Sequence, residues 1–201
     1  MPNKKIKNFR PDKNAYYINI AKEVASRSTC MSTHIGAIIV KNDQIIATGY
    51  NGAPRKTKDC YERGFCLRRE LKIPSGQYYE ICRSVHAEQN AIINAARSGV
   101  NILGGDMYSW GMKVWAGANE LLDILPCYIC KKMILNSGLN SLYYMSKSGK
   151  IIKIDILKNW TKDWQKRDML DDMKKYSTDY SKEYKKIEIS KEKKEKNVNK
   201  K

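Results

Sequence analysis

The sequence predicts an α/β protein in which a mixed sheet carries helices on both of its faces. Residues 35–40 and 45–50 are two apolar, β-branched runs joined by the short turn 41–44, a pattern typical of an antiparallel hairpin. Two helical stretches follow later, each leading into a short strand, and such an order predicts parallel strand pairs with helices packed on the sheet. The 201 residues, 42% of them hydrophobic, suit one domain with a core and a tail.

The first half of the chain predicts a helix, the hairpin and a second helix. Apolar side chains recur at helical spacing over residues 12–28, and Cys30 is expected to end this helix. After the hairpin, residues 51–82 combine glycine, proline, cysteine and many charges, and a loop of this length is usually functional or pinned. A helix is expected over residues 84–98, with Gly99 as its stop.

The second half predicts three strands around one more helix. Strands are expected at 107–110, 141–145 and 151–157, and Pro126 opens a helix that runs to Asn136. Residues 111–125 fit either an extra hairpin or a loop with a helical turn. We expect a main domain at residues 1–157 and a lysine-rich C-terminal extension at 158–201. That extension is predicted to be amphipathic helix over 160–176 and disordered over 177–201.

Charge and cysteine usage narrow the class of protein. The net charge of +17 favours anionic partners such as nucleotides, nucleic acid or an anionic membrane. We find neither a signal peptide nor an apolar run of membrane-spanning length, so a cytoplasmic protein without membrane contact is expected. In that compartment six cysteines indicate metal binding or catalysis more often than disulfides.

Two short segments carry the chemistry. His86-Ala87-Glu88 and Pro126-Cys127-Tyr128-Ile129-Cys130 together offer one imidazole and two thiolates. Catalytic zinc sites use three protein ligands and leave a fourth position open. Cys127 and Cys130 are three residues apart at the start of a predicted helix, where unpaired backbone N–H groups favour thiolates. We therefore predict a catalytic zinc held by His86, Cys127 and Cys130.

Glu88 is predicted to be the catalytic acid and base. It lies two residues beyond His86, so on a helix its side chain points elsewhere and is free to act on the attacking water. A buried carboxylate has a raised pKa, which suits a group that takes a proton from water and returns protons to a ring nitrogen and a departing amine.

With these motifs the chain resembles the cytidine and deoxycytidylate deaminase superfamily, most closely its dCMP-deaminating branch. The order H-x-E followed by P-C-x-x-C is a signature of zinc deaminases. The similarity covers about residues 15–146, and its matching stretches are residues 36–40, 48–54, 86–92 and 126–134. The resemblance implies a cytidine-deaminase-like three-layer sandwich and the zinc-dependent hydrolysis of dCMP to dUMP and ammonia. Residues 111–125 depart from the family, because its members usually reach the Pro-Cys motif in a few residues.

The resemblance also implies ligands and partners. Asn51 would contact the substrate, and the Ala87 backbone would meet the pyrimidine carbonyl. Relatives form homo-oligomers, often hexamers, and many respond to dCTP and dTTP. Arg97 matches an arginine near a subunit interface, although a solvated helix end explains it equally well. Arg55, Lys56, Arg83 and Lys113 are candidates for holding a phosphate, and each also fits an ordinary solvent-facing role.

The other four cysteines are Cys30, Cys60, Cys66 and Cys82. Some relatives bind a second, structural zinc near the start of the chain and in this loop, and four thiolates would pin residues 51–82. The alternative is a set of unrelated thiols.

Two further functions compete with dCMP deamination. One is a deaminase of another base or nucleoside, such as tRNA adenosine, cytidine or a riboflavin-pathway pyrimidine. The other is a non-catalytic, basic, zinc-stabilised protein that binds nucleic acid. Glu88 argues against the last, because a structural zinc does not need it. The lysine run also lacks the interleaved aromatic residues on which bases stack, so a nucleic-acid partner is not expected.

Overall fold

The computed structural model describes residues 10–166. In chain order the helices and strands are α1 (Lys13–Ala25), β1 (Thr33–Lys41), β2 (Gln44–Tyr50), α2 (Cys60–Arg63), α3 (Leu67–Glu70), η1 (Tyr79–Ile81), α4 (Ala87–Arg97), β3 (Asp106–Lys113), η2 (Trp115–Gly117), β4 (Glu120–Leu121), α5 (Tyr128–Asn136), β5 (Ser141–Met145), β6 (Ile151–Asp155), the π-helix η3 (Ile156–Thr161) and α6 (Lys162–Lys166).

The sheet is mixed, as predicted. Its order is β2-β1-β3-β5-β6, and β4 pairs with the far end of β3. Both β2 and β3 run antiparallel to β1, so the connection from β2 through α4 to β3 joins two strands of the same direction across β1. The next connection, through α5, places β5 parallel to β3, and β6 returns antiparallel along the edge.

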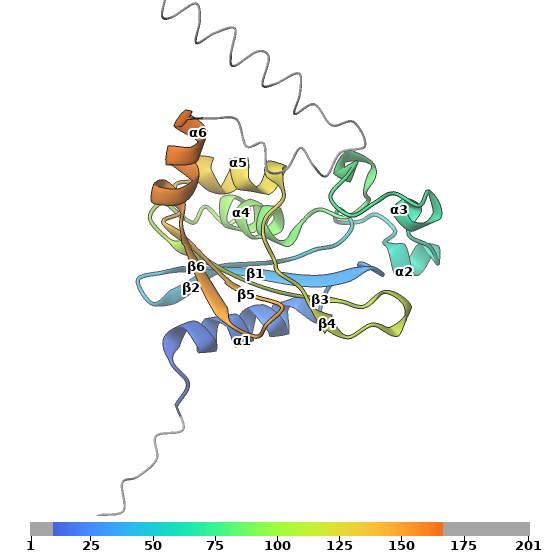
Figure 1. The fold of residues 1–201 in the computed structure, drawn as a ribbon, viewed down its shortest axis with the longest axis horizontal. Coiled ribbons are helices and arrows are strands. Elements are labelled where there is room, and N and C mark those ends of the chain that lie inside the picture. Colours follow the sequence, from blue (N-terminus) through green and yellow to red (C-terminus); the bar gives the residue numbers. More distant parts are fainter. Residues whose placement is uncertain (1–9, 167–201) are drawn as a thin grey trace, which may run out of the picture.

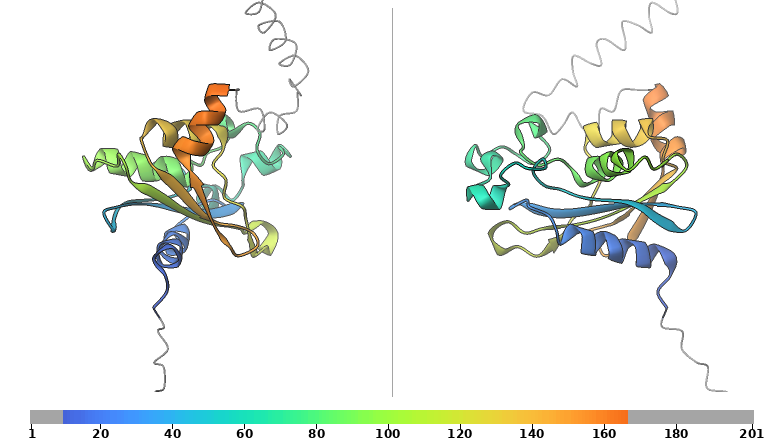
Figure 2. Two further views of the ribbon diagram at one scale, coloured as in Figure 1. Left: turned by 60° about the vertical axis from the view of Figure 1, so that its left-hand side comes forward. Right: turned by 180° about the vertical axis from the view of Figure 1, so that it is seen from behind.

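Helices cover both faces of the sheet, which confirms the predicted three-layer α/β architecture. Helices α4 and α5 lie over one face and α1 lies under the other (Figures 1 and 2). Each interface has its own buried cluster: Ile39, Met107 and Leu142 belong to the cluster on the α4–α5 side, and Ile38 and Tyr108 to that on the α1 side. The alternation of side chains along β1 supplies both clusters.

The helix α4 approaches β2 closely because β2 has a glycine at the crossing. A Cβ atom on Gly49 would collide with the backbone of Ala87 and Ala91. Two side chains of α4 also bind the strand: Asn90 Nδ2 donates to the carbonyl of Tyr50 and Asn94 Nδ2 to that of Thr48, each at 2.7 Å. The first turn of α4 is thereby held at a defined height above the sheet.

Three helix boundaries differ from the sequence-based expectation. Helix α1 ends at Ala25, so Cys30 lies in the following loop. Helix α4 begins at Ala87 rather than residue 84, because Val85 forms a β-bridge with Gly52 that keeps the preceding chain extended. Helix α5 begins at Tyr128, two residues after Pro126.

Both structures expected for residues 111–125 are present. Strand β3 extends to Lys113, the turn η2 follows, and β4 returns to pair with β3. The loop between β2 and α4 contains the short helices α2, α3 and η1.

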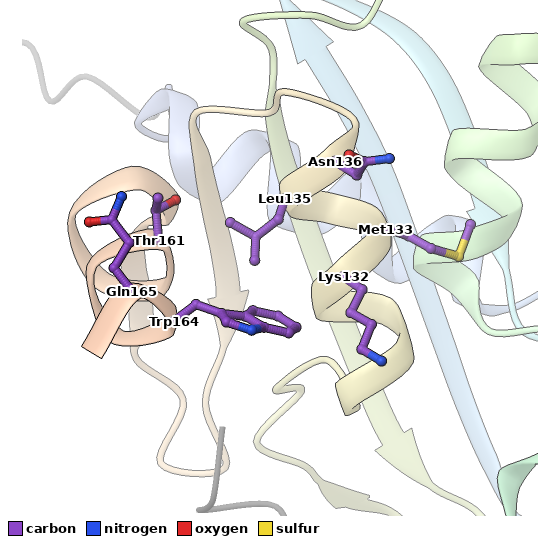
Figure 3. A pocket seen from close by; sticks show the side chains of 7 residues that line it. All are labelled: Lys132, Met133, Leu135, Asn136, Thr161, Trp164 and Gln165. Carbon is purple, nitrogen blue, oxygen red and sulfur yellow. The ribbon is translucent and has the colours of Figure 1, made fainter. Parts of the chain in front are cut away.

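The chain beyond β6 packs on the core. Ile156 and Trp160 of the π-helix belong to the cluster on the α4–α5 side, so the core includes side chains past residue 157. The ring of Trp164 in α6 approaches that of Tyr128 in α5. Side chains of both helices, among them Leu135 and Trp164, line a groove between them (Figure 3). Helix is thus present over the first part of the predicted 160–176 segment; the rest of it and the tail predicted to be disordered lie outside the described residues. Across residues 10–166, each helix is too short or too polar to traverse a bilayer.

Candidate active site

The first half of the site lies at the N-terminus of α4. His86 is the N-cap residue, in extended conformation, and its backbone N–H donates to Gln89 Oε1 at 3.0 Å. Glu88 follows in the first turn and is 4% exposed. His86 therefore precedes the helix and its Nδ1 faces the two cysteines, while Glu88 projects from the first turn itself.

The second half lies at the N-terminus of α5. Cys127 is its N-cap residue and Cys130 is three residues further on, so both sulfurs lie at the positive end of the helix dipole. Cys130 is fully buried and Cys127 is half-buried. The N-terminal turns of α4 and α5 therefore present ligands to a shared point above the sheet.

The three predicted ligands come together at metal-binding distance. His86 Nδ1 is 3.4 Å from Cys127 Sγ and 3.3 Å from Cys130 Sγ. In a tetrahedral zinc site with bonds of about 2.3 Å to sulfur and about 2.0 Å to nitrogen, such ligand atoms lie about 3.5 Å apart. Among residues 10–166 this is the sole group in which three or more ligand atoms lie within 4.8 Å of one another. The donor set and its spacing fit a zinc ion.

The charges of the site favour thiolate at Cys127. A hydrogen bond from Cys130 lowers the pKa of Cys127 to about 4, and the contact with His86 acts in the same direction against the effect of burial. That same hydrogen bond and burial raise the pKa of Cys130. Burial lowers the pKa of His86, but the hydrogen bond that its imidazole donates to Cys127 and the charge of Glu88 outweigh it, so the net shift is upward.

Glu88 lies beside the ligand set without belonging to it. Its Oε2 is 3.8 Å from Cys130 Sγ. Burial raises the pKa of its carboxyl group, although the nearby His86 opposes this shift. A carboxyl group whose pKa burial raises, next to a metal-binding triad, has the chemistry of a proton shuttle.

Asn51 lies in the same cleft and is held by the protein on both sides of its amide. Its Oδ1 accepts from Ile35 N at 2.8 Å and Ser28 Oγ at 2.7 Å, and its Nδ2 donates to the carbonyl of Thr33 at 2.9 Å. One hydrogen of Nδ2 is left for a further acceptor. Ala87 begins α4, where the backbone N–H groups have no acceptor within the helix.

The four other predicted ligands gather near one another, on the loop before β1 and on the segment between β2 and α4. Cys30, Cys60 and Cys66 are buried and Cys82 is half-buried. Burial raises the pKa of Cys60 to about 11, and the other three thiols add to the shift. No three of these sulfurs lie within 4.8 Å of one another in the described chain, so their spacing is wider than that of a closed zinc tetrahedron.

The cleft also contains residues that sequence reasoning missed. It encloses about 430 Å³ around His86, Glu88 and Cys127, and Arg68, Arg69 and Tyr79 line it. The basic residues expected to hold a phosphate do not line this cleft. Arg55 Nη2 donates to Asn94 Oδ1 at 2.7 Å, and Arg83 donates to the carbonyl of Lys58. Lys113 Nζ lies 3.8 Å from Glu120 Oε2. Two adjacent arginines, Arg68 and Arg69, could have been recognised in the sequence as a candidate anion-binding pair. Helical spacing alone, however, does not show that α3 faces the site.

Comparisons with known proteins agree with this site. A family model described as the cytidine and deoxycytidylate deaminase zinc-binding region matches residues 11–146. Deoxycytidylate deaminase of Schizosaccharomyces pombe is 33% identical over 138 residues, which are 68% of this chain and 38% of that protein. The deoxycytidylate deaminase of Mycobacterium phage D29 is 32% identical over 144 residues, covering 69% of this chain and 98% of the phage protein.

The coverage of these relatives differs. The chain spans 38% of the length of the S. pombe protein and of its Saccharomyces cerevisiae counterpart. A crystal structure of dCMP deaminase from the cyanophage S-TIM5 in apo form aligns at 27% identity with a TM-score of 0.49, over 68% of this chain and 85% of that one. The extent of the family match, together with a histidine and two cysteines at zinc-binding distance, shows that the chain belongs to the zinc-binding cytidine and deoxycytidylate deaminase family.

Proposed function

We propose that this protein is a hydrolase that deaminates dCMP to dUMP and ammonia. The observation that carries the proposal is the buried carboxyl group of Glu88, 3.8 Å from one sulfur of the His86, Cys127 and Cys130 triad. A metal site with a structural role has no use for an acid–base group at this position.

The reaction needs water, an activating cation and a proton carrier. When bound, zinc supplies a Lewis acid that makes water a better nucleophile near neutral pH. Glu88 accepts a proton from the water that attacks C4 of the cytosine ring and delivers it to N3. It then takes the proton of the new C4 hydroxyl and passes it to the exocyclic amine. The C4–N bond breaks, ammonia leaves and the C4 oxygen becomes the carbonyl of dUMP.

Two contacts are proposed for the base. Asn51 lines the cleft and has one amide hydrogen left for a ligand, and the backbone N–H of Ala87 lies in the first turn of α4. The choice of dCMP rests on the relatives named deoxycytidylate deaminase and on a cleft of about 430 Å³, which falls within the roughly 300–1,000 Å³ of small-molecule sites.

A substrate panel tests the proposal. The zinc-loaded protein is incubated with dCMP, CMP, dCTP, cytidine and deoxycytidine, and ammonia is measured. Fast turnover of a free nucleoside without turnover of dCMP would refute the substrate, and inactivity on every cytosine compound would refute the cytosine class. Glu88→Gln should keep its zinc and lose roughly 10²–10⁴-fold in kcat, whereas Glu23→Gln, exposed on α1, should match the wild type.

We propose in addition that Cys30, Cys60, Cys66 and Cys82 hold a second, structural zinc. Their support is that they are buried or half-buried and gather where the segment between β2 and α4 meets the loop before β1. Metal binding would draw the sulfurs together and displace their protons. Metal analysis should give two zinc ions per chain for the wild type and one for Cys60→Ser; one ion in the wild type would refute the second site.

We also propose a cytoplasmic homo-oligomer that responds to dCTP and dTTP. The six cysteines are all free thiols, which suits a reducing compartment. Ile93 and Arg97 lie four residues apart on the exposed side of α4 and offer a surface for a second copy. Light scattering with and without dCTP or dTTP measures the oligomeric state and its response to each nucleotide. A monomer under all of these conditions would contradict the proposed oligomer and its response.

A further inference from the structure

Two consecutive arginines of α3 lie at the cleft that contains the metal triad. Arg68 and Arg69 line it together with His86 and Glu88. They belong to the segment between β2 and α4, far from the zinc-binding motifs in the sequence. Two cationic side chains at a catalytic cleft favour an anionic ligand, because neither makes an ion pair with a carboxylate of the described chain.

Arg68 is held rigidly next to the metal triad. Its Nη2 donates to the carbonyls of Pro74 and Gln77 at 2.8 and 2.7 Å. Its guanidinium lies 4.7 Å from the centre of the Tyr79 ring, and that ring meets His86 edge-on with centroids 4.8 Å apart. A single aromatic ring therefore separates the guanidinium from a predicted zinc ligand.

Arg68 makes no ion pair with a carboxylate of the described chain, although its charge acts on the nearby thiol of Cys82. Its buried Nε has no hydrogen-bond partner, and Nη2 donates only to the neutral carbonyls of Pro74 and Gln77. Within residues 10–166 no carboxylate lies within 4.0 Å of Arg68 or Arg69. A buried guanidinium donor without an acceptor is unfavourable, so the arrangement is suited to an anionic ligand.

Arg69 is positioned at the exposed mouth of the same cleft. Its Nε and Nη2 contact Ser32 Oγ at 3.2 and 2.7 Å, and its guanidinium lies 5.2 Å from the centre of the Trp115 ring. The side chain thus joins α3, the loop before β1 and the turn after β3. Its Nη1 remains for a ligand, and the acidic residue Asp123 elsewhere on the lining is exposed.

We propose that Arg68 and Arg69 bind the phosphate of the nucleotide and so select nucleotides over free nucleosides. The inference rests on the proposed deamination and adds the subsite that sets its specificity. A guanidinium binds phosphate oxygens through parallel N–H donors, which an ammonium cannot do. Arg68 contributes its positive charge from the wall of the cleft, and Arg69 offers its Nη1 to the phosphate from the mouth.

The test compares dCMP with deoxycytidine in single variants of the zinc-loaded protein. In Arg69→Gln and Arg68→Lys, the ratio of kcat/KM for dCMP to kcat/KM for deoxycytidine should fall roughly 10- to 100-fold, mainly through the KM of dCMP. Arg63→Gln is the matched control. Arg63 lies on α2 of the same segment, packs on Phe65 at 4.1 Å and does not line the cleft, so its ratio should be unchanged.

Calorimetry with dCMP, deoxycytidine and inorganic phosphate separates this inference from the proposed reaction. The wild type should bind dCMP more tightly than deoxycytidine, and Arg69→Gln should lose that difference and weaken phosphate binding. If the wild type binds in this way but releases no ammonia, the deaminase proposal fails and the phosphate subsite stands. An unchanged preference for dCMP in both folded variants would overturn the subsite.

Discussion

Replacing Asn51 with alanine should lower the free energy of unfolding, because this buried side chain is hydrogen-bonded to three other groups. Asn51 is 4% exposed and makes three hydrogen bonds, to Ile35 N, Ser28 Oγ and the carbonyl of Thr33. Alanine leaves the N–H of Ile35 without its acceptor, at about 1–3 kcal/mol if it stays unsatisfied. Ser28 Oγ still has the backbone carbonyls of Asn51 and Thr33 within reach, at 2.9 and 3.4 Å, so those partners lose less. We therefore expect a loss of about 2–3 kcal/mol in the free energy of unfolding.

The assay is urea unfolding of the zinc-loaded protein, followed by circular dichroism. Asn51→Asp provides a second variant: it keeps both acceptor contacts of Oδ1 but turns a carboxylate oxygen toward the Thr33 carbonyl, so it should also be destabilised. Asn140→Ala is the matched control, because this exposed residue makes one side-chain hydrogen bond, to the carbonyl of Gly104 at 2.8 Å. It should lose at most about 1 kcal/mol.

Activity separates the two roles of Asn51. If the remaining amide hydrogen contacts the base or sugar, the folded fraction of Asn51→Ala should lose kcat/KM on dCMP and deoxycytidine by the same factor. A loss below about 1 kcal/mol in stability would refute the hydrogen-bond reasoning, since it would mean that the three partners are satisfied without the amide.

The remaining predictions concern the metal ligands and the core. In chelator-treated protein, Cys127 should react with iodoacetamide at about pH 6, because a thiol with a pKa of about 4 is ionised there, and zinc should protect it; no reaction would contradict the lowered pKa. Trp160→Ala should lose about 3–5 kcal/mol in urea unfolding, and the less buried Trp164→Ala clearly less. Gly49→Ala should push α4 off β2 and weaken zinc affinity in competition with a chelator; wild-type affinity would show that the strand yields instead.

Much of the metal site was predictable because its signals are local. His86 and Cys127 each cap a helix, and their motifs lie within a few residues of a helix start. Periodicity predicted helices and strands for the same reason, since the side chains that define a period are neighbours in the chain. The errors lie at helix ends, where distant contacts compete with local preference, as the bridge between Gly52 and Val85 does before α4.

What the sequence by itself determined is the chemistry: an imidazole, two sulfurs and a carboxyl group at spacings that zinc and proton transfer require. What only the tertiary structure decided is what surrounds that chemistry. Arg68 and Arg69 reach the cleft because α3 folds against the loop before β1 and the turn after β3, and Trp160 joins a core built mostly from residues before 157. Such contacts join segments that are far apart in the chain, so they follow from the packing of the whole fold and leave no periodic trace in the sequence.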